Sequence, residues 1–175
     1  YVYIIMNKPK GYISASNDKN AETVVDLVPK EMRRKNLFPA GRLDKDTTGM
    51  LIITDDGDFA HRMLPPKKHV EPVYKATLDG DVTDEMVENS RKGISFYDGT
   101  LCLSAKLLPN KENPHLARVI IREGKYHQVK KMFLTQGLTV KELHREQIGM
   151  LKLPKDLAPG ECRFMQEDEK RNIFL

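Results

Sequence analysis

The alternation of apolar and polar positions along the chain predicts many short strands and a few short helices. Runs rich in β-branched and aromatic residues, each bounded by glycine, proline or acidic turn residues, indicate the strands. The run at 50–54 is apolar at four successive positions, which indicates a strand buried on both faces. Strands are predicted at 1–6, 50–54, 72–79, 101–108, 117–122, 140–148 and 160–163.

Capping residues and apolar spacing predict the helices. Thr23 and Asp26 have the spacing of a capping box before an apolar pair, and a proline opens a second short segment that runs to residue 35. A turn at Asp56-Gly57 precedes a short helix, and Gly137 is a natural terminator for a longer one. These later helices are predicted at 58–64, 84–92 and 125–136. Together the elements predict an α+β fold with a mixed, mostly antiparallel sheet and flanking helices.

The predicted helix 125–136 has one apolar face. At about 100° per residue, Lys131 points away from this face into water, whereas Lys130 lies on its flank. A flanking lysine can bury its stem and direct its ammonium to the edge of a cleft, where it could pair with a carboxylate such as Asp44. A simple surface lysine is the alternative. The apolar face carries Tyr126, Val129, Met132, Phe133 and Gln136.

Composition restricts the class of protein. Apolar residues make up 39% of the 175 residues and charged residues 31%, which supplies a packed core but no membrane span. The two cysteines, Cys102 and Cys162, have no metal-site spacing, so we expect reduced thiols, no metal and a cytoplasmic location. Because the chain begins at Tyr1 in an apparent strand, we expect it to be a fragment that lacks its natural N-terminus.

Charge is distributed unevenly along the sequence. The net charge is only +4, but residues 115–145 contain seven lysines and arginines against two acids. Residues 79–98 contain six acids against two basic residues. This asymmetry indicates one basic and one acidic face, and the basic face would suit an anionic partner such as nucleic acid. An ordinary solvated surface explains the same charges, so the pattern leaves both possibilities open.

The segment 41–49 (GRLDKDTTG) carries the best candidate chemistry. It is a charged loop that directly precedes the apolar strand, and rigid strands often support catalytic loops. Asp44 and Asp46 are candidate carboxylates, and the nearby cations Arg42 and Lys45 could keep one of them ionised. A polar turn without catalytic function is the alternative.

Other polar side chains give weaker signals. Tyr74 lies in a predicted strand, where its ring could stack on a flat base or simply fill the core. Leu143 is typical of a core position. His127 and His144 lack partners at triad or metal spacing, so both are interpreted as polar or RNA-facing. No phosphate-binding or dinucleotide-binding glycine motif is present.

Four segments in order along the chain resemble the bacterial rRNA pseudouridine synthases. They are 7–11 (NKPKG), 41–57 (GRLDKDTTGMLIITDDG), 123–132 (EGKYHQVKKM) and 143–149 (LHREQIG). The match spans residues 1 to about 165 and is closest to the small-subunit branch, called RsuA. Large-subunit relatives tend to have Arg and Asn at the positions of Tyr126 and His127. Many members carry an N-terminal RNA-binding domain of the S4 type, which we expect to be absent from this chain.

The resemblance implies a pseudouridine synthase fold over 1–175, possessing two small lobes that share one sheet and a catalytic cleft across it. It implies that uridine is isomerised without a cofactor. Asp44 would be the essential carboxylate, either attacking C1′ of the ribose or removing a ribose proton to give a glycal. Lys130 takes the family position of the cation beside it, and Tyr74 that of the tyrosine that packs on uracil and accepts the C5 proton. Leu43 and Leu143 would line the pocket.

The implied substrate is small-subunit (16S) rRNA, as a precursor or an assembly intermediate, at the uridine equivalent to position 516. A uridine in structured RNA must leave its stack to reach Asp44, so we expect base flipping supported by phosphate contacts. We expect a monomer. The candidate RNA-binding residues are Lys8, Lys10, Arg42, Arg62, Lys68, His127, Gln128 and Lys131.

Three alternatives stay open. A large-subunit (23S) rRNA synthase of the same family would share every motif above. A non-catalytic RNA-binding or ribosome-assembly module fits the basic charge equally well, although it does not require Asp44, Tyr74 and Lys130 together. A glycosidase that uses Asp44 and Asp46 as its carboxylate pair ranks last, because residues two apart in a loop need not converge.

Overall fold

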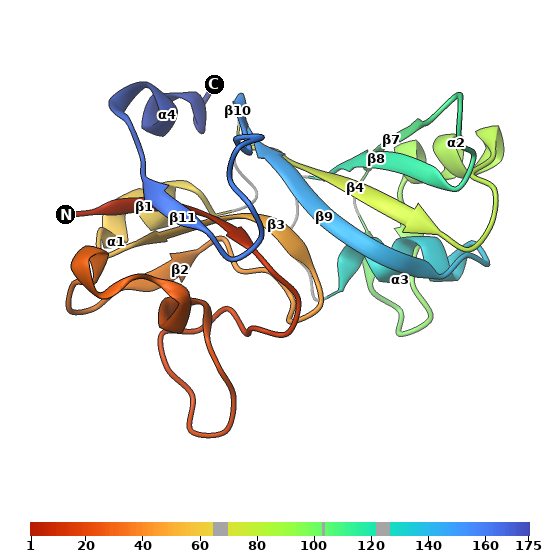
Figure 1. Ribbon diagram of the computed structural model, residues 1–175. Helices are drawn as coiled ribbons and strands as arrows, with labels where there is room; N and C mark the ends of the chain where they lie inside the picture. The colour runs from red at the N-terminus through yellow and green to blue at the C-terminus, as the bar shows by residue number, and fades with distance from the viewer. Residues whose placement is uncertain (65–69, 103, 122–126) are drawn as a thin grey trace.

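A single nine-stranded sheet runs through two lobes in the computed structural model, which describes residues 1–64, 70–102, 104–121 and 127–175 (Figure 1). The strand order is β11-β1-β3-β9-β4-β8-β7, with β2 beside β3 and β10 beside β9. The first lobe holds β1 (Tyr3–Lys8), β2 (Phe38–Ala40), β3 (Thr48–Thr54) and β11 (Cys162–Phe164). The second holds β4 (Pro72–Leu78), β7 (Lys106–Pro109) and β8 (Leu116–Ile120), and β9 (Val140–Ile148) and β10 (Leu151–Lys152) connect the lobes.

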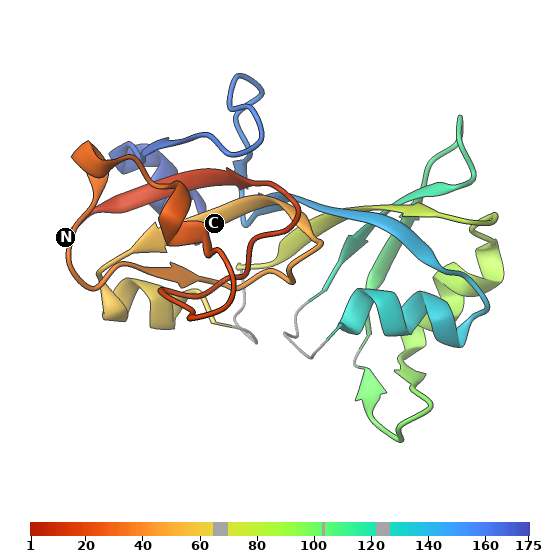
Figure 2. The same ribbon diagram turned by 60° about the horizontal axis from the view of Figure 1, so that its bottom comes forward.

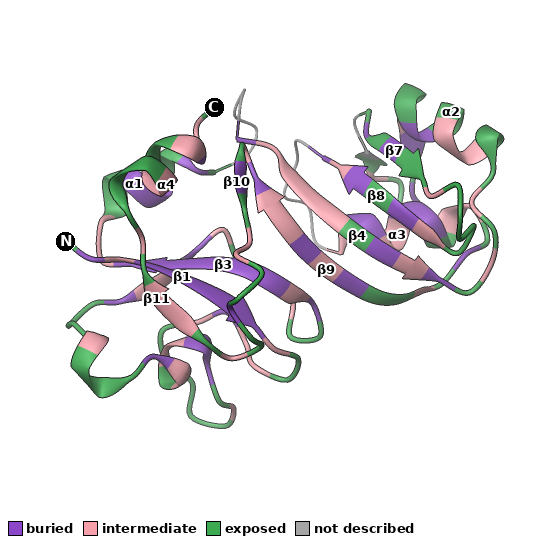
Figure 3. Ribbon diagram, turned by 45° about the horizontal axis from the view of Figure 1, so that its top comes forward, coloured by how far each residue is buried: buried purple, intermediate pink, exposed green. Residues whose placement is uncertain are grey.

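Strand β3 forms the centre of the first lobe, as its apolar run predicts. Successive side chains of a strand point to opposite faces, so Met50 and Ile52 enter one core cluster while Leu51 and Ile53 enter the other. All four are fully buried, and each such side chain stabilises the fold by about 1.5–3 kcal/mol. Figure 3 shows the resulting band of buried residues along β1 and β3.

The two halves of the sheet meet at a short parallel contact between β3 and β9. Its register pairs Thr48 with His144 and Gly49 with Arg145, and the other pairings between named strands of the described chain are antiparallel. At Gly49 the backbone has φ +110°, and a Cβ there would lie 2.2 Å from the carbonyl oxygen of Arg145. Only glycine permits this approach. The contact brings the loop before β3 against the second lobe.

In the second lobe, α2 (Asp84–Lys92) and α3 (Gln128–Thr135) lie on the same side of the sheet (Figure 2). The α3 residues Val129, Met132 and Phe133 are buried in the core of this lobe, which confirms the predicted apolar face for the described residues. Tyr126 falls outside them. A separate hairpin, β5 (Ile94–Ser95) and β6 (Leu101–Cys102), projects from the lobe on the helix side (Figure 2).

The remaining helices cover the first lobe. They are α1 (Gly57–Arg62), α4 (Glu167–Asn172) and two 3-10 turns, η1 (Val24–Leu27) and η2 (Lys30–Met32). Asp56 begins α1 by accepting a hydrogen bond from the Phe59 backbone N–H at 3.1 Å. Among the described residues, the helices are too short or too polar to cross a bilayer. The α+β class with a mostly antiparallel sheet is therefore confirmed.

One predicted strand is wrong and several short elements were not predicted. The described residues of this range, 101–108, form two strands in different sheets, β6 and β7, because the backbone N–H of Ala105 turns away to donate to the Ser90 carbonyl of α2 at 2.8 Å. The segment at 29–35 is a single turn, η2, rather than a longer helix. The elements missing from the prediction are β2, β5, β10 and α4, and each has six residues or fewer.

Candidate active site

A cavity of about 670 Å³ lies where the loop before β3 faces the second lobe. Its walls bring together all five residues predicted as catalytic or pocket-lining, although they are distant in the sequence. Asp44 and Leu43 come from the loop, Tyr74 from β4, Lys130 from α3 and Leu143 from β9. The cavity is thus a single candidate active site built from both lobes.

Arg145 holds the two ends of the loop that carries Asp44. Its side chain is only 4% exposed, and its Nε donates to the Met50 carbonyl at 2.8 Å while a terminal nitrogen donates to the Gly41 carbonyl at 2.7 Å. The planar guanidinium suits two such acceptors at once. Arg145 belongs to the segment predicted to form a basic face, whereas the structure buries its side chain as a clamp on the loop.

Lys8 fastens the middle of the same loop, and its predicted role as an RNA contact is wrong. Its side chain is fully buried, and Nζ donates to the carbonyls of Pro9, Lys45 and Thr47 at 3.0, 2.9 and 2.8 Å. Burial lowers the pKa of Lys8 to about 8, against the opposing effect of the Asp46 and Asp44 charges. With its ammonium directed inward, Lys8 cannot reach a phosphate.

A serine and a turn complete the support of Asp44. The Ser14 hydroxyl donates to the Leu43 carbonyl at 2.7 Å and accepts from the Leu43 N–H at 3.0 Å. The Asp44 carbonyl accepts from the Thr47 N–H at 3.1 Å, which closes a tight turn. The backbone on both sides of the carboxylate is therefore fixed before any substrate binds.

The carboxylate of Asp44 pairs with His127. Nε2 of His127 lies 3.3 Å from Oδ2 of Asp44, and both side chains are 34% exposed. Lys130 lines the same cavity, but in the described part of the chain it forms no ion pair with Asp44 within 4 Å. Arg42 also lines the cavity as an exposed side chain, whereas Lys45 contributes mainly its carbonyl to the loop.

The cavity also has an aromatic and apolar lining. Tyr74 is partly buried, and it packs against the cores of both lobes. Leu43 and Leu143 are each 6% exposed and line the cavity beside it. A flat heterocycle could lie between such walls with one edge toward Asp44, because apolar surfaces and a few polar groups together orient a ligand. His144 lies nearby, with Nδ1 2.8 Å from the Thr48 hydroxyl, and burial lowers its pKa.

The candidate RNA-binding residues do not form one surface. His127 and Gln128 line the cavity, although Gln128 is only 4% exposed. Arg62 lies over the Phe174 ring at 4.3 Å, on α1 and outside the cavity lining. Lys68 lies outside the described residues. Arg42, described above, is the exposed cation of the set that lines the cavity.

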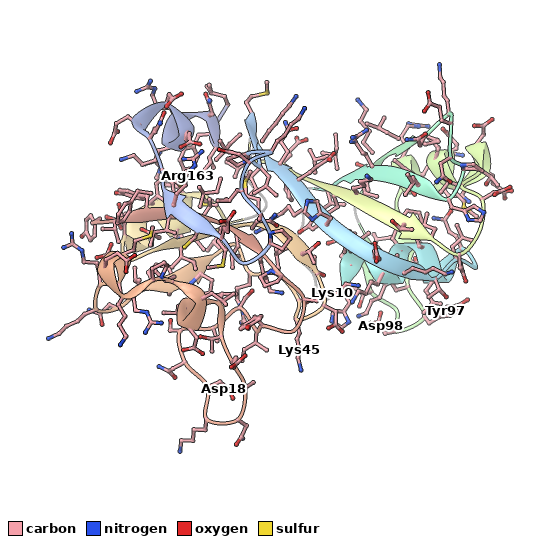
Figure 4. All side chains as sticks on the ribbon, in the orientation of Figure 1. Lys10, Asp18, Lys45, Tyr97, Asp98 and Arg163 are labelled. Atoms are coloured by element: carbon pink, nitrogen blue, oxygen red, sulfur yellow. The ribbon has the colours of Figure 1, made fainter. Side chains whose placement is uncertain are left out.

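Two further basic residues sit near the meeting point of the lobes. Lys10 forms an exposed ion pair with Glu142 at 3.7 Å, and Lys131 pairs with Asp98 of the β5–β6 hairpin at 3.1 Å. In the view of Figure 4, Lys10 and Lys45 lie below the junction of the two lobes. Among the described residues of the segment 115–145, Arg118 and Lys131 therefore contribute ion pairs and Arg145 a buried clamp.

Sequence reasoning missed the partnership of His127 with Asp44 and the support from Ser14, Lys8 and Arg145. The glycines at 41 and 49 mark a strained loop, but residue type alone does not show which cation is buried against it. Contacts between residues about 80 to 104 positions apart, such as His127–Asp44 and Arg145–Gly41, leave no signal in a single sequence.

The fold and this cavity describe a candidate enzyme site, and comparison with known proteins gives its family. The chain belongs to the RNA pseudouridylate synthase family, whose model matches residues 2–135. It is a pseudouridine synthase. A protein named as an uncharacterized RNA pseudouridine synthase from Bacillus subtilis is 42% identical over 171 residues, which cover 97% of this chain and 72% of that protein.

Two further relatives extend this match. The ribosomal small subunit pseudouridine synthase A of Escherichia coli is 41% identical over 171 residues, covering 98% of this chain and 73% of that protein. A crystal structure of a pseudouridylate synthase superposes with a TM-score of 0.90 at 34% identity, covering 98% of this chain and 73% of that one. An archaeal box H/ACA Nop10–Cbf5 complex shares the fold at 20% identity, with a TM-score of 0.61 over 91% of this chain and 51% of that one.

Proposed function

We propose that this enzyme converts one uridine of small-subunit (16S) rRNA to pseudouridine, at the uridine equivalent to position 516, with Asp44 as its essential carboxylate. The observation that carries the proposal is the placement of Asp44 and Tyr74 in one cavity, with no other carboxylate in its described lining. The choice of small-subunit rRNA is supported by 41% identity to the small-subunit synthase over nearly the whole chain.

The chemistry is an isomerisation in which atoms and charges balance. The bond between N1 of uracil and C1′ of ribose breaks, the base rotates, and C5 bonds to C1′. C5 then loses its proton and N1 gains one. Asp44 either attacks C1′ or removes the C2′ proton to give a glycal, and in both cases it must be ionised. A cation beside it favours that state, and Lys130 is within the cavity lining.

Tyr74 and the two leucines would hold the uracil while it is detached from the ribose. A ring packed on Tyr74 between Leu43 and Leu143 loses its hydration but keeps freedom to rotate in its own plane. The phenol is the group near the base that can accept the C5 proton. A volume of about 670 Å³ is within the range of small-ligand sites, so one flipped nucleotide can enter while the rest of the RNA stays outside.

Cations in and around the cavity would hold the RNA backbone. Arg42 and Lys10 are exposed and close to the loop of Asp44, and Lys131 lies on the far side on α3. Phosphate contacts of this kind would offset the few kcal/mol needed to unstack the target base. The described residues of both lobes line the cavity, and we propose that the enzyme acts as a monomer in the cytoplasm, in keeping with an rRNA substrate.

The test is pseudouridine formation on 16S rRNA and on its assembly intermediates, with Asp44→Asn and the matched control Asp46→Asn. Both substitutions remove one carboxylate from the same loop, but Asp46 does not line the main cavity. We expect one modified uridine with the wild type, a rate loss of about 1000-fold or more for Asp44→Asn, and a loss of less than about 5-fold for Asp46→Asn. Thermal unfolding would verify that both variants are folded.

Each other outcome points to a different function. Modification of 23S rRNA alone would make the enzyme a large-subunit synthase. Release of free uracil would indicate a glycosidase, and binding of rRNA without any modified base would indicate an assembly module. An Asp44→Asn variant as active as the wild type would refute the role of the carboxylate.

A further inference from the structure

We propose that His127 is a positioning residue, which holds one oxygen of the Asp44 carboxylate and leaves the other directed at the ribose. This inference rests on the proposed function, because it concerns how Asp44 is presented to a uridine. The contact that carries it is the 3.3 Å approach of Nε2 to Oδ2 inside the cavity. Nε2–H donates to the carboxylate in the imidazolium form and in one neutral tautomer, and the charged form adds a Coulomb attraction.

The backbone at His127 is an independent observation. Its φ of +49° and ψ of +35° place a non-glycine residue in the left-handed region, where the described chain has only one other, Asn36. This conformation costs about 1 kcal/mol or more, and such strain is concentrated at functional sites. The strain is local, since the His127 carbonyl still accepts the first helical hydrogen bond of α3 from Lys131 at 2.9 Å.

The direction of the imidazole shows what the strained backbone achieves. A residue that precedes a helix usually turns its side chain back to cap the free N–H groups, but His127 makes no such capping bond. Its ring instead reaches across the cavity to the loop of the other lobe. The left-handed turn therefore places the imidazole against Asp44 at the expense of the ordinary helix cap.

Lys130 occupies a different place from His127, although both belong to the start of α3. Besides the main cavity, Lys130 lines a second hollow of about 370 Å³ together with Asp46, Lys10 and Glu142. Lys130 thus lines both the cavity that contains Asp44 and the hollow that contains Asp46 and Glu142, whereas His127 contacts Asp44 directly. We infer that His127 sets the direction of the carboxylate, and that Lys130 supplies positive charge to the cavity at longer range.

Two substitutions separate the effect of the hydrogen bond from His127 to Asp44 from the effect of the left-handed backbone at residue 127. His127→Asn keeps a residue that accepts the left-handed region, but its amide nitrogen ends one bond nearer the backbone than Nε2 and does not reach Asp44. His127→Gln places an amide N–H at the same number of bonds from Cβ as Nε2, so it restores the donor without a charge. The readouts are the single-turnover rate of pseudouridine formation, the Kd for the rRNA fragment and the Tm.

We expect His127→Asn to lower the single-turnover rate by about 10- to 100-fold, with Kd changed less than about 3-fold and the fold intact. We expect His127→Gln to recover most of that rate. The inference is overturned if the Asn variant keeps the wild-type rate, if Kd rather than the rate changes, or if Gln fails to recover the rate while its Tm matches that of the Asn variant.

A spectroscopic measurement keeps this test separate from the proposed function. The ring ¹⁵N shifts of His127 report whether Nε2 carries the proton that Asp44 accepts. We expect these shifts to move in Asp44→Asn and to stay unchanged in Asp46→Asn. If the wild type forms no pseudouridine but the shifts behave in this way, the proposed function fails and the contact stands. If the ring ¹⁵N shifts of His127 are unchanged in Asp44→Asn, the contact between His127 and Asp44 is refuted.

Discussion

Replacing Lys8 by methionine tests the idea that a buried ammonium holds the catalytic loop. Methionine has nearly the same volume and no polar donor, so the substitution leaves the carbonyls of Pro9, Lys45 and Thr47 without their partner. Lys10→Met is the matched control. It makes the same exchange two residues away on an exposed side chain, whose surface ion pair contributes at most about 1 kcal/mol.

Two opposing contributions set the expected change in the free energy of unfolding for Lys8→Met. Each hydrogen bond from a charged donor stabilises a fold by about 1.5–3 kcal/mol, and Lys8 makes three. Against this stands the cost of burying the charge. A pKa lowered from 10.5 to about 8 corresponds to roughly 3 kcal/mol. We therefore expect Lys8→Met to lower the free energy of unfolding at pH 7 by about 3 kcal/mol, and Lys10→Met by less than about 0.5 kcal/mol.

The stability difference between the wild type and Lys8→Met should increase with pH. The pKa of Lys8 is about 8 in the folded protein and near 10.5 in the unfolded chain, so the unfolded chain binds more protons between these values. The free energy of unfolding contributed by Lys8 therefore rises as pH increases through this window. Between pH 7 and 9.5 the difference between wild type and Lys8→Met should grow by about 2 kcal/mol.

Urea unfolding followed by circular dichroism at pH 7, 8.5 and 9.5 measures this difference directly. Other groups that titrate at high pH cancel between the two proteins. One is Tyr3, whose pKa a hydrogen bond to Asp56 raises to about 12. A difference that stays flat or shrinks with pH, or a Lys8→Met variant as stable as the wild type, would refute the reasoning about burial of this charge.

The remaining predictions concern the junction of the two lobes. Gly49→Ala should lower the free energy of unfolding by about 3 kcal/mol or more, because the new Cβ meets the Arg145 backbone at a positive φ. The control Gly57→Ala adds a Cβ in open space and should leave the free energy of unfolding unchanged or raise it slightly. Equal urea midpoints for the two variants would contradict this. Arg145→Lys should cost about 2 kcal/mol and slow pseudouridine formation, since one ammonium cannot serve the Met50 and Gly41 carbonyls with the geometry of the fork. The exposed control Arg118→Lys should retain both properties, and parallel behaviour of the two variants in urea unfolding and rate assays would argue against a clamp.

Much of the secondary structure was predictable because it depends on local patterns. The apolar run of β3 gave both the strand and its burial on two faces, and α2 begins and ends at the predicted residues. The predicted strand at 101–108 failed because a long-range contact from Ala105 to Ser90 decides where that backbone turns. Very short elements such as β10 have no pattern of their own and form only as neighbours of longer strands.

The candidate site was predictable in its residue types but not in its contacts. The family resemblance led to Asp44, Tyr74 and Lys130, and these residues do line one cavity. The sequence could not distinguish a lysine at the surface from one in the interior, so Lys8 was assigned to RNA although its ammonium faces three carbonyls. The pairing of His127 with Asp44 depends on how the two lobes meet, which no local pattern encodes.

The order of strands in the sheet has a consequence for synthesis on the ribosome. β1 pairs on one side with β3 and on the other with β11, so the first lobe combines the earliest strand of the chain with one of the latest. The second lobe is made almost entirely of the intervening residues 72–148. It can finish folding while the first lobe still exposes an open edge at β1, because domains acquire structure as their residues emerge. Completion of the lobe that bears Asp44 must therefore wait until Cys162–Phe164 leave the exit tunnel, so the lobe whose strands emerge first is completed last.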